Sequence, residues 1–564
     1  MNSTTIRKRP RVGRVSSFEL APGRLAKVLS SLRRGDVLVR FALAFAAAVA
    51  IWTVALGWLP PFPYHAGYVP QRNITARVGF SVPDPRAIAT ETEQFLRYEP
   101  GEALALAGEP LQPKTVALLE LEHKTYIAQK FSNVASSERG VALFALIVGL
   151  LGLAGYYVYL RDRRMINDLY QLSLVLVSSC VAILLARWTA GDPWRAEIIP
   201  LLLFGMTIGI TYGRELALVL SSALTLMFVL ADGAGLVHMV LLLGIITSAI
   251  VQLGRIRSRR KLIWVGLISG SIAPVLTVAA GMLDGQPAAR PLFNLAGQNG
   301  VWTLLAGFLI TGLLPFVEGL FGVLTEISLL ELGDVAHPLL QELVRRAPGT
   351  YNHSINVASI AEAAAESIGA RGLLVRVGAY FHDIGKMLKP HYFVENQGLE
   401  ESRHDSLVPA MSTLIIIAHI KDGADLARQH RLPQPIIDLI EQHHGTTLVE
   451  YFFRRASQQS ATDPDSGDVQ ESSFRYPGPK PQTVEAAVLM MADTVESASR
   501  VLVEPTPSRI ESLVEEIAMK KLLDGQFDEC GLTLEQLRKI EDSLVKSLTA
   551  VYHGRVKYPD QRTA

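Results

Sequence analysis

Eight long apolar runs dominate the first 322 residues of this 564-residue chain and constrain its fold more than any other feature. A helix needs about 20 apolar residues to cross a bilayer, and each run approaches that length. The sequence therefore predicts a polytopic membrane protein, and the hydrophobic share of 49% agrees with this prediction. The runs are residues 39–59, 140–160, 169–187, 197–213, 215–231, 234–253, 262–283 and 301–322.

Positive charges between the runs predict the orientation of the bundle. Arginine and lysine gather in the cytoplasmic loops of membrane proteins, and alternate connections here are rich in them, whereas the opposite short loops hold only Arg195 and Arg290. Because the number of spans is even, both termini are expected in the cytoplasm, with the protein in a bacterial inner membrane. The basic positions are Arg161, Arg163, Arg164, Arg214, Arg255, Arg257, Arg259, Arg260 and Lys261.

The first run follows a basic tail, residues 1–38, and a basic flank also occurs in secretory signals. The run is long, however, and it ends in Trp-Leu-Pro-Pro without a small-residue cleavage pattern, so we expect an uncleaved anchor over residues 39–59. Residues 60–139 form a short extracytoplasmic segment that ends in a predicted helix from Lys114 to Ser137. We interpret this segment as a packing cap for the bundle and expect no sensing role for it.

The other seven runs, residues 140–322, predict an antiparallel bundle in which small residues from Gly266 to Gly270 let helices approach closely. None of the seven has Asp, Glu, Lys or Arg near its middle, although ion and solute pathways usually need such groups. We interpret His238 as a histidine near the outer interface and not as a proton relay. The sequence therefore argues against a transporter.

Beyond residue 325 the pattern changes to amphipathic helices of a soluble cytoplasmic domain, residues 323–558. Apolar residues recur every three or four positions, which is the helical period, and residues 457–482 predict a flexible insertion because they are rich in Ser, Gln, Asp and Pro. The predicted fold is therefore all-α, a transmembrane bundle followed by a helical domain. The predicted helices are 327–346, 354–368, 372–384, 407–430, 433–443 and 483–502, then one with Pro507 in its first turn and one opened by a capping box at Thr533 to Gln536.

Charge and cysteine content exclude some classes of protein. A net charge of +1 gives no sign of a nucleic-acid polymer as partner. Two cysteines do not form a disulfide framework, so a reducing cytoplasm suits the soluble domain.

Histidines interrupt the apolar stripes of this domain, and eight of the thirteen fall between residues 353 and 444. A single such histidine is more often a hydrogen-bonded core residue, but several together with carboxylates favour a metal site. Imidazole and carboxylate ligands without thiolates suit Fe or Mn and also admit Zn. The adjacent pair His382-Asp383 would let one carboxylate bridge two ions, and two ions can clamp the attacking and leaving oxygens of a phosphodiester.

The order of these residues resembles the ligand pattern of the HD superfamily of metal-dependent phosphohydrolases. Longer segments are similar to the seven-transmembrane HD family of membrane-bound cyclic di-AMP phosphodiesterases, at residues 347–354, 381–387, 441–447 and 476–481, and the similarity covers residues 140–558. The pattern consists of His353, His382, Asp383, His419, His443, His444 and Asp493.

The resemblance implies a site with two iron or two manganese ions that opens cyclic di-AMP to the linear dinucleotide pApA, and so a role in second-messenger turnover. By this analogy His353, His382 and Asp493 bind one ion, and Asp383 is a catalytic residue that bridges both. Lys386 reaches a phosphate of the substrate. The ligands of the other ion are His419, His443 and His444.

Two departures from the family pattern stand out. Asn352 occupies a place where family members commonly have a second histidine beside the ligand, and the exterior segment is shorter than the usual extracytoplasmic domain. Arg475 and Lys480 are further candidates for substrate contact, although a basic loop explains them equally well.

Two other functions remain as alternatives. A cyclic di-GMP phosphodiesterase of the HD-GYP type shares the two-metal chemistry, but that group usually has Glu where Gly445 follows the His pair. The second alternative is a receptor that binds the nucleotide without hydrolysis. Loss of metal ligands would favour a receptor, but all seven ligands of the pattern are present. The sequence leaves open the native metal, the base preference and whether the protein forms a homodimer.

Overall fold

The computed structural model describes residues 35–55, 59–83, 95–130, 138–191, 194–254, 256–397, 402–462 and 469–553. Most of the predicted basic tail and the middle of the predicted insertion lie outside these ranges. The chain divides into two compact units. The first contains residues 1–254 and 260–321, and the second contains residues 255–259 and 322–564.

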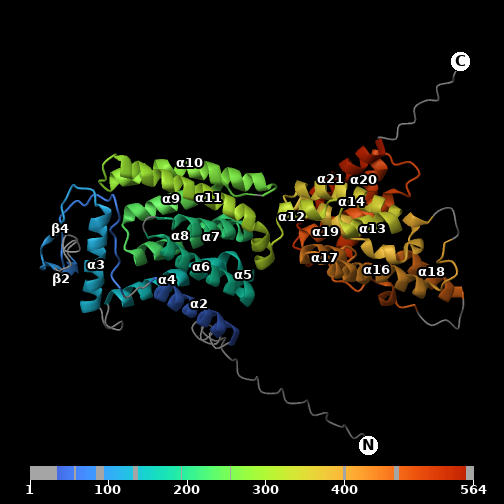
Figure 1. The fold of residues 1–564 in the computed structure, drawn as a ribbon. Coiled ribbons are helices and arrows are strands. Elements are labelled where there is room, and N and C mark those ends of the chain that lie inside the picture. Colours follow the sequence, from blue (N-terminus) through green and yellow to red (C-terminus); the bar gives the residue numbers. More distant parts are fainter. Residues whose placement is uncertain are drawn as a thin grey trace, which may run out of the picture. The chain divides into compact units, whose positions relative to one another are not determined.

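The first unit consists mainly of long helices that lie side by side (Figure 1). Each of the eight apolar runs coincides with one of them. The helices are α2 (Gly35–Val54), α3 (Pro113–Lys130), α4 (Glu138–Arg161), α5 (Arg163–Asn167), α6 (Leu169–Thr189), α7 (Ile198–Tyr212), α8 (Arg214–Asp232), α9 (Leu236–Gln252), α10 (Arg259–Leu283) and α11 (Arg290–Phe321).

Six of the described helices are long and apolar enough to cross a membrane, namely α2, α4, α6, α8, α10 and α11. The apolar helices α7 and α9 have only 15 and 17 residues, so at a rise of about 1.5 Å per residue they fall short of a hydrocarbon core of about 30 Å. Such short spans are accommodated by local thinning of the bilayer. His238 lies in the first turn of α9, 3.5 Å from Glu197.

Helices α10 and α11 approach closely where glycines face each other. A Cβ atom added to Gly266 would lie only 2.9 Å from the Cα atom of Gly307, and one added to Gly270 would lie 3.1 Å from the carbonyl oxygen of Gly300. Asn299 on α11 also donates a hydrogen bond to the Thr277 hydroxyl on α10. The predicted close approach at Gly266 to Gly270 is therefore confirmed.

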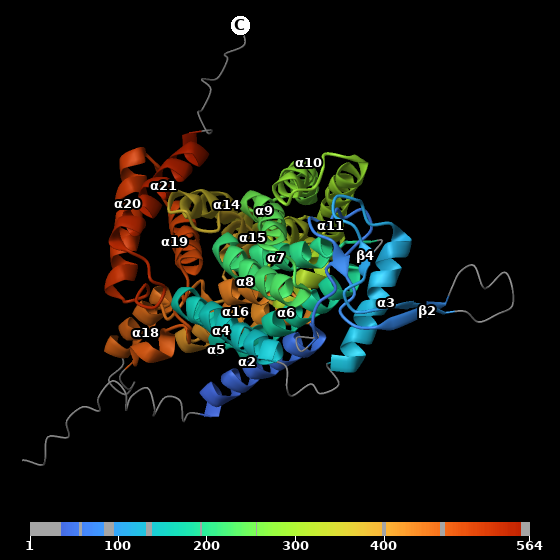
Figure 2. The same ribbon diagram turned by 90° about the vertical axis from the view of Figure 1, so that its left-hand side faces the viewer.

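The segment between α2 and α4 contains short strands that the sequence did not predict. The strands pair antiparallel as β1 with β4 and β2 with β3, and they lie beside α3 (Figure 2). Phe80 stacks on Tyr98 across the second pair, with ring centroids 5.1 Å apart. The helix predicted from residue 114 is α3, which ends at Lys130, and residues 131–137 lie outside the described part. The strands are β1 (Ile74–Thr75), β2 (Phe80–Pro83), β3 (Phe95–Tyr98) and β4 (Ala103–Ala105).

The second unit is entirely helical apart from one isolated bridge between Leu448 and Arg475 in its described residues. Its α-helices are α12 (Glu326–Leu332), α13 (Pro338–Arg346), α14 (Pro348–Ser367), α15 (Gly372–Phe381), α16 (Pro409–Gln429), α17 (Gln434–Gln442), α18 (Glu450–Thr462), α19 (Val484–Ser499), α20 (Pro507–Leu523) and α21 (Leu534–His553). Four 3₁₀ turns complete it, η3 (Ile384–Leu388), η4 (Pro390–Tyr392), η5 (Val394–Asn396) and η6 (Glu471–Phe474).

Apolar faces of α14, α15, α17, α19 and α21 form one core in this unit. Ala361, Val375 and Leu489 are fully buried in it, and Ile540 from α21 joins them. The predicted capping box is confirmed at the start of α21, because Thr533 N donates to Gln536 Oε1 and Gln536 N donates to Thr533 Oγ1. These helices form the scaffold on which the histidines sit.

Two predicted segments of this unit differ from the structure. The helix predicted over residues 327–346 is divided into α12 and α13, because Gly333 ends the first and Pro338 begins the second. The insertion predicted as flexible over residues 457–482 contains the end of α18 and the turn η6, and only residues 463–468 lie outside the described part. Polar composition alone did not reveal that this segment packs against the domain.

Candidate metal centre

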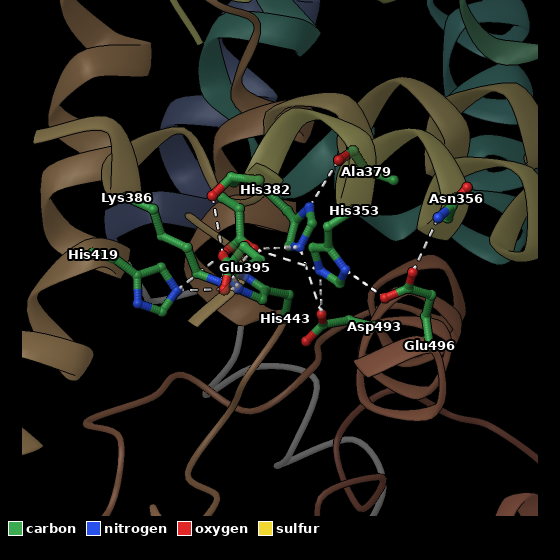
Figure 3. A network of polar contacts seen from close by, with 12 residues as sticks. His353, Asn356, Ala379, His382, Lys386, Glu395, His419, His443, Asp493 and Glu496 are labelled. Atoms are coloured by element: carbon green, nitrogen blue, oxygen red, sulfur yellow. Dashed lines mark hydrogen bonds and ion pairs between the residues drawn. The ribbon is translucent and has the colours of Figure 1, made fainter. Parts of the chain in front are cut away.

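Five α-helices of the second unit bring the predicted ligands to one buried centre (Figure 3). His353 lies on α14, His419 on α16 and Asp493 on α19. His382 and His443 are the residues directly after α15 and α17, and Asp383 precedes η3. All of these side chains are buried, and His444 is partly buried.

The ligand atoms form two groups, and within each group they lie within 4.8 Å of one another. One group contains His419, His443 and His444. The other contains His353, His382, Asp383 and Asp493. The structure therefore brings together all seven residues that were predicted from the sequence as metal ligands.

Asp383 lies between the two groups and presents one carboxylate oxygen to each. Its Oδ2 is 3.2 Å from His382 Nε2 and 3.6 Å from His353 Nε2. Its Oδ1 is 3.3 Å from His419 Nε2 and 3.7 Å from His443 Nε2. This geometry is suited to a carboxylate that bridges two cations.

The polar atoms at the middle of the centre fit a pair of divalent ions. His382 Nε2 and both carboxylate oxygens of Asp383 are buried and make no hydrogen bond with the described residues, although charged groups lie within ion-pair distance. A buried polar atom without a hydrogen bond costs about 1–3 kcal/mol. Coordination of cations by these atoms would offset that cost, so the donor set is suited to metal binding.

Backbone carbonyls orient three of the histidines. His382 Nδ1 donates to Ala379 O at 2.7 Å, His419 Nδ1 donates to Ile416 O at 2.6 Å, and His443 Nδ1 donates to Ile440 O at 2.8 Å. Carbonyls in the last turn of a helix lack an intrahelical partner, which makes them available after α15 and α17. Each bond leaves Nε2 directed at the centre, as metal-binding histidines require.

Glu496 orients the fourth histidine, and the sequence analysis missed it. Its Oε2 accepts a hydrogen bond from His353 Nδ1 at 2.6 Å, and its Oε1 accepts one from Asn356 at 3.2 Å (Figure 3). Glu496 lies three residues after Asp493, on the same face of α19. An acidic residue one turn beyond a ligand in an apolar helix was the available signal. Asn352, which the sequence placed near the ligands, is exposed.

Lys386 is buried among carboxylates next to the bridging residue. Its Nζ is 2.7 Å from Asp383 Oδ2 and 3.0 Å from Glu395 Oε1, and Thr350 also donates to Glu395 Oε1. Although burial opposes it, the charges of Asp383 and Glu395 raise the pKa of Lys386 above its ordinary value. Lys386 is therefore a fixed positive charge beside the centre.

The two groups of ligands differ in their electrostatics. Although burial opposes it, Asp383 and Asp493 raise the pKa of His382 to about 10. Burial lowers the pKa of His419 to about 3 and holds that of His444 well below its ordinary value. The pKa values of ligands in the two groups are therefore shifted in opposite directions.

A network from the C-terminal helices holds the turn that follows His444. Gln526 is fully buried, accepts a hydrogen bond from Thr446 N at 3.0 Å and donates to Thr446 Oγ1 at 2.9 Å. Arg475 donates to Thr446 O at 2.8 Å and pairs with Asp524 at 2.9 Å. Gly445 in this turn has a φ of +53°, which glycine adopts readily.

Arg475 and Lys480 were candidates for substrate contact, and in the structure both side chains donate hydrogen bonds to backbone carbonyls of the domain. Arg475 holds the turn at Thr446, and Lys480 Nζ donates to Gly525 O at 2.9 Å. Tyr476, between them, is buried against the ring of His444 with centroids 4.4 Å apart. This loop thus supports the histidine pair.

Comparison with known families assigns both parts of the chain. Residues 350–498 match the model of the HD domain, so the centre described above is that of an HD domain. Residues 138–325 match the model of the family described as 7TM receptor with intracellular HD hydrolase. The expected family resemblance is therefore confirmed.

The relatives of this chain include two proteins named cyclic-di-AMP phosphodiesterase PgpH. The one from Bacillus subtilis (strain 168) is 42% identical over 315 residues, which are 56% of this chain and 43% of the relative. The one from Listeria monocytogenes serotype 1/2a (strain 10403S) is 47% identical over 265 residues, or 46% of this chain and 36% of the relative. The chain thus spans less than half the length of these relatives.

Solved structures of the Listeria monocytogenes PgpH HD domain also match. One is 48% identical and aligns over its full length with 38% of this chain, with a TM-score of 0.36. A second, in complex with cyclic-di-AMP, aligns over its full length with 39% of this chain at the same identity and a TM-score of 0.37.

Proposed function

We propose that this chain is a membrane-anchored, metal-dependent phosphodiesterase that hydrolyses cyclic di-AMP to linear pApA and so turns over a second messenger. The observation that carries the proposal is Asp383, whose two oxygens face separate groups of buried ligands. The choice of cyclic di-AMP rests on the names of the relatives from Bacillus and Listeria.

The HD domain implies divalent metal binding, and the ligand chemistry supports two ions of Fe or Mn. His353, His382 and Asp493 would hold one ion, and Asp383 would contact both. When bound, such a pair supplies an activated water and stabilises the charge that develops on the phosphodiester. The other ion would be held by His419, His443 and His444.

The protein's own residues complete the reaction site. Asp383 would link the two groups of ligands, because each of its oxygens faces one group. Lys386 supplies a fixed positive charge next to Asp383, and we propose that it meets a phosphate oxygen of the substrate. Glu395 keeps the lysine in place through its 3.0 Å contact. The backbone bonds of His382, His419 and His443 keep their Nε2 atoms directed inward.

The sequence and the candidate spans support a layout for the whole chain. We propose a bacterial inner-membrane protein with both termini in the cytoplasm, an anchor at residues 39–59 and an exterior segment at residues 60–139. The bundle of residues 140–322 then leads to the cytoplasmic hydrolase of residues 323–558.

Hydrolysis by the purified full chain in detergent tests this function. With Mn or Fe(II) added, we expect cyclic di-AMP to be opened to pApA, cyclic di-GMP to be cut more slowly, and a chelator to stop both reactions. Faster cleavage of cyclic di-GMP would favour the alternative substrate. Two bound ions per chain without cleavage of either nucleotide would contradict the proposal and favour a receptor.

A further inference from the structure

His353 differs from three other histidines of the centre in the group that accepts a hydrogen bond from its Nδ1 atom. His382, His419 and His443 each donate Nδ1 to a neutral backbone carbonyl. His353 instead donates Nδ1 to the carboxylate of Glu496, with Nδ1 and Oε2 2.6 Å apart. A carboxylate makes a ligating imidazole a stronger donor than a carbonyl does, and it also adds negative charge near the ion.

The environment of Glu496 fixes this carboxylate in place and favours its ionised form. Arg500, one turn later on α19, donates to both oxygens, with Nε 2.9 Å from Oε1 and 3.0 Å from Oε2. Asn356 on α14 donates to Oε1. Glu496 is 4% exposed, so water competes little for these bonds.

The extra carboxylate adds to an asymmetry that already exists between the two groups. The group of His353 also contains Asp493, whose Oδ1 is 3.0 Å from His353 Nε2. The group of His419 contains three imidazoles, which carboxylates approach through Asp383 Oδ1, 3.3 Å from His419 Nε2, and Asp493 Oδ2, 3.6 Å from His444 Nδ1. Glu496 contacts a histidine of the first group, so its negative charge lies nearer to the ion that this group would hold.

We propose that Glu496 is a positioning residue that makes the group of His353, His382 and Asp493 the tighter metal site. The group of His419, His443 and His444 is then the weaker site, from which an ion exchanges first. This inference rests on the proposed function insofar as both require two ions.

A titration of Mn(II) into the full chain in detergent, after removal of metal by a chelator, tests the inference. Free Mn(II) is followed by electron paramagnetic resonance. The wild-type protein is expected to bind two ions in two separate steps. Glu496→Gln, which removes the charge at nearly constant size, should weaken the first step by about ten- to a hundredfold and leave the second step unchanged.

Further variants show which group of ligands is responsible for each of the two binding steps. Glu504→Gln removes an exposed carboxylate that pairs with Arg509, so both steps should stay as in the wild type. His419→Ala should abolish the second step and keep the first. Glu496→Asp keeps the charge but withdraws the carboxylate from His353 Nδ1, so it should weaken the first step less than Glu496→Gln does. Circular dichroism of the metal-free variants verifies that they are folded.

Two equal sites in the wild type would overturn the inference, and so would equal weakening of both steps by Glu496→Gln. If Glu496→Gln does not fold, the Glu496→Asp titration decides, and an unchanged first step overturns the inference. Because the titration counts bound ions and not product, it is independent of the proposed reaction. Unequal binding without hydrolysis would contradict the function alone, whereas hydrolysis with two equal sites would contradict this inference alone.

Discussion

Asp383 is the residue at which the two halves of the centre meet, because each of its oxygens faces a different group of histidines. Asp383→Asn keeps the shape and removes the charge, so we expect bound metal to fall below two ions per chain and hydrolysis to fall at least about a hundredfold. Metal analysis and product assays measure both effects. Asp425→Asn, on the exposed side of α16, is the control. Normal turnover by Asp383→Asn would eliminate the proposed centre.

Substitution of Lys386 tests whether the positive charge beside Asp383 contributes to substrate binding. We expect Lys386→Gln to raise KM for cyclic di-AMP about tenfold, as for loss of a charge-assisted hydrogen bond worth about 1.5–3 kcal/mol, with metal content unchanged. Initial rates over a range of substrate concentrations give KM and kcat separately. Lys389→Gln, at an exposed position, should behave as wild type. Loss of metal with an unchanged KM would instead assign Lys386 a structural role.

Metal binding should depend on pH because ions compete with protons for the imidazoles. The carboxylates raise the pKa of His382 to about 10 in spite of its burial, and the bonds with Asp493 and Glu496 raise that of His353. At pH 7 an ion must displace these protons, so affinity should increase from pH 6 to pH 8. Calorimetry in buffers of different ionisation enthalpy counts the released protons. Affinity that is independent of pH would contradict this prediction.

Several of the seven ligands could be recognised because they place a polar group where an apolar residue is expected, and the resemblance to the HD pattern supplied the complete set. His353 and Asp493, which are 140 positions apart, needed the family pattern to be paired, since spacing does not reveal which helices meet. Glu496 and Glu395 were missed. Both act through other residues, and their partners are defined only once α14, α19 and η5 are packed together.

At the scale of elements, Gly385 controls the approach of η3 to α16. A Cβ atom at Gly385 would overlap the carbonyl oxygen of His419 and crowd the amide of Gly423. Gly385→Ala should therefore displace His419, destabilise the domain by about 1–3 kcal/mol and weaken metal binding. Thermal unfolding with and without Mn(II) measures this. Gly312→Ala, where the added methyl meets open space, is the control, and equal effects of both changes would contradict the argument.

Helices were more predictable than the other elements because their apolar period extends over many residues. The run at residues 407–430 corresponds to α16 (Pro409–Gln429), and the run at 483–502 corresponds to α19 (Val484–Ser499). The strands of the exterior segment were missed because they have two to four residues each, too few for alternation to be visible. The turns η3 to η5 were missed because, with three to five residues each, they are too short to show a helical period.

At the scale of the whole molecule, the orientation of the bundle can be tested by labelling. In a Cys180→Ala, Cys530→Ala background, Glu99→Cys in the exterior segment should react with a membrane-impermeant maleimide in intact cells. Ser508→Cys on α20 should react only after the cells are permeabilised. Both positions are exposed, so access to the thiol depends on the side of the membrane. Labelling of Ser508→Cys in intact cells would contradict the cytoplasmic placement.

The bonds of Gln526 to the turn after His444 have a consequence for how the hydrolase can be divided. The match to the HD family ends at residue 498, yet the amide that fixes the turn at Thr446 comes from beyond α20. Ile540 and Leu544 of α21 are also buried in the core. A fragment cut at residue 498 would lose both supports, so the smallest fragment that keeps the centre in place should extend through α21.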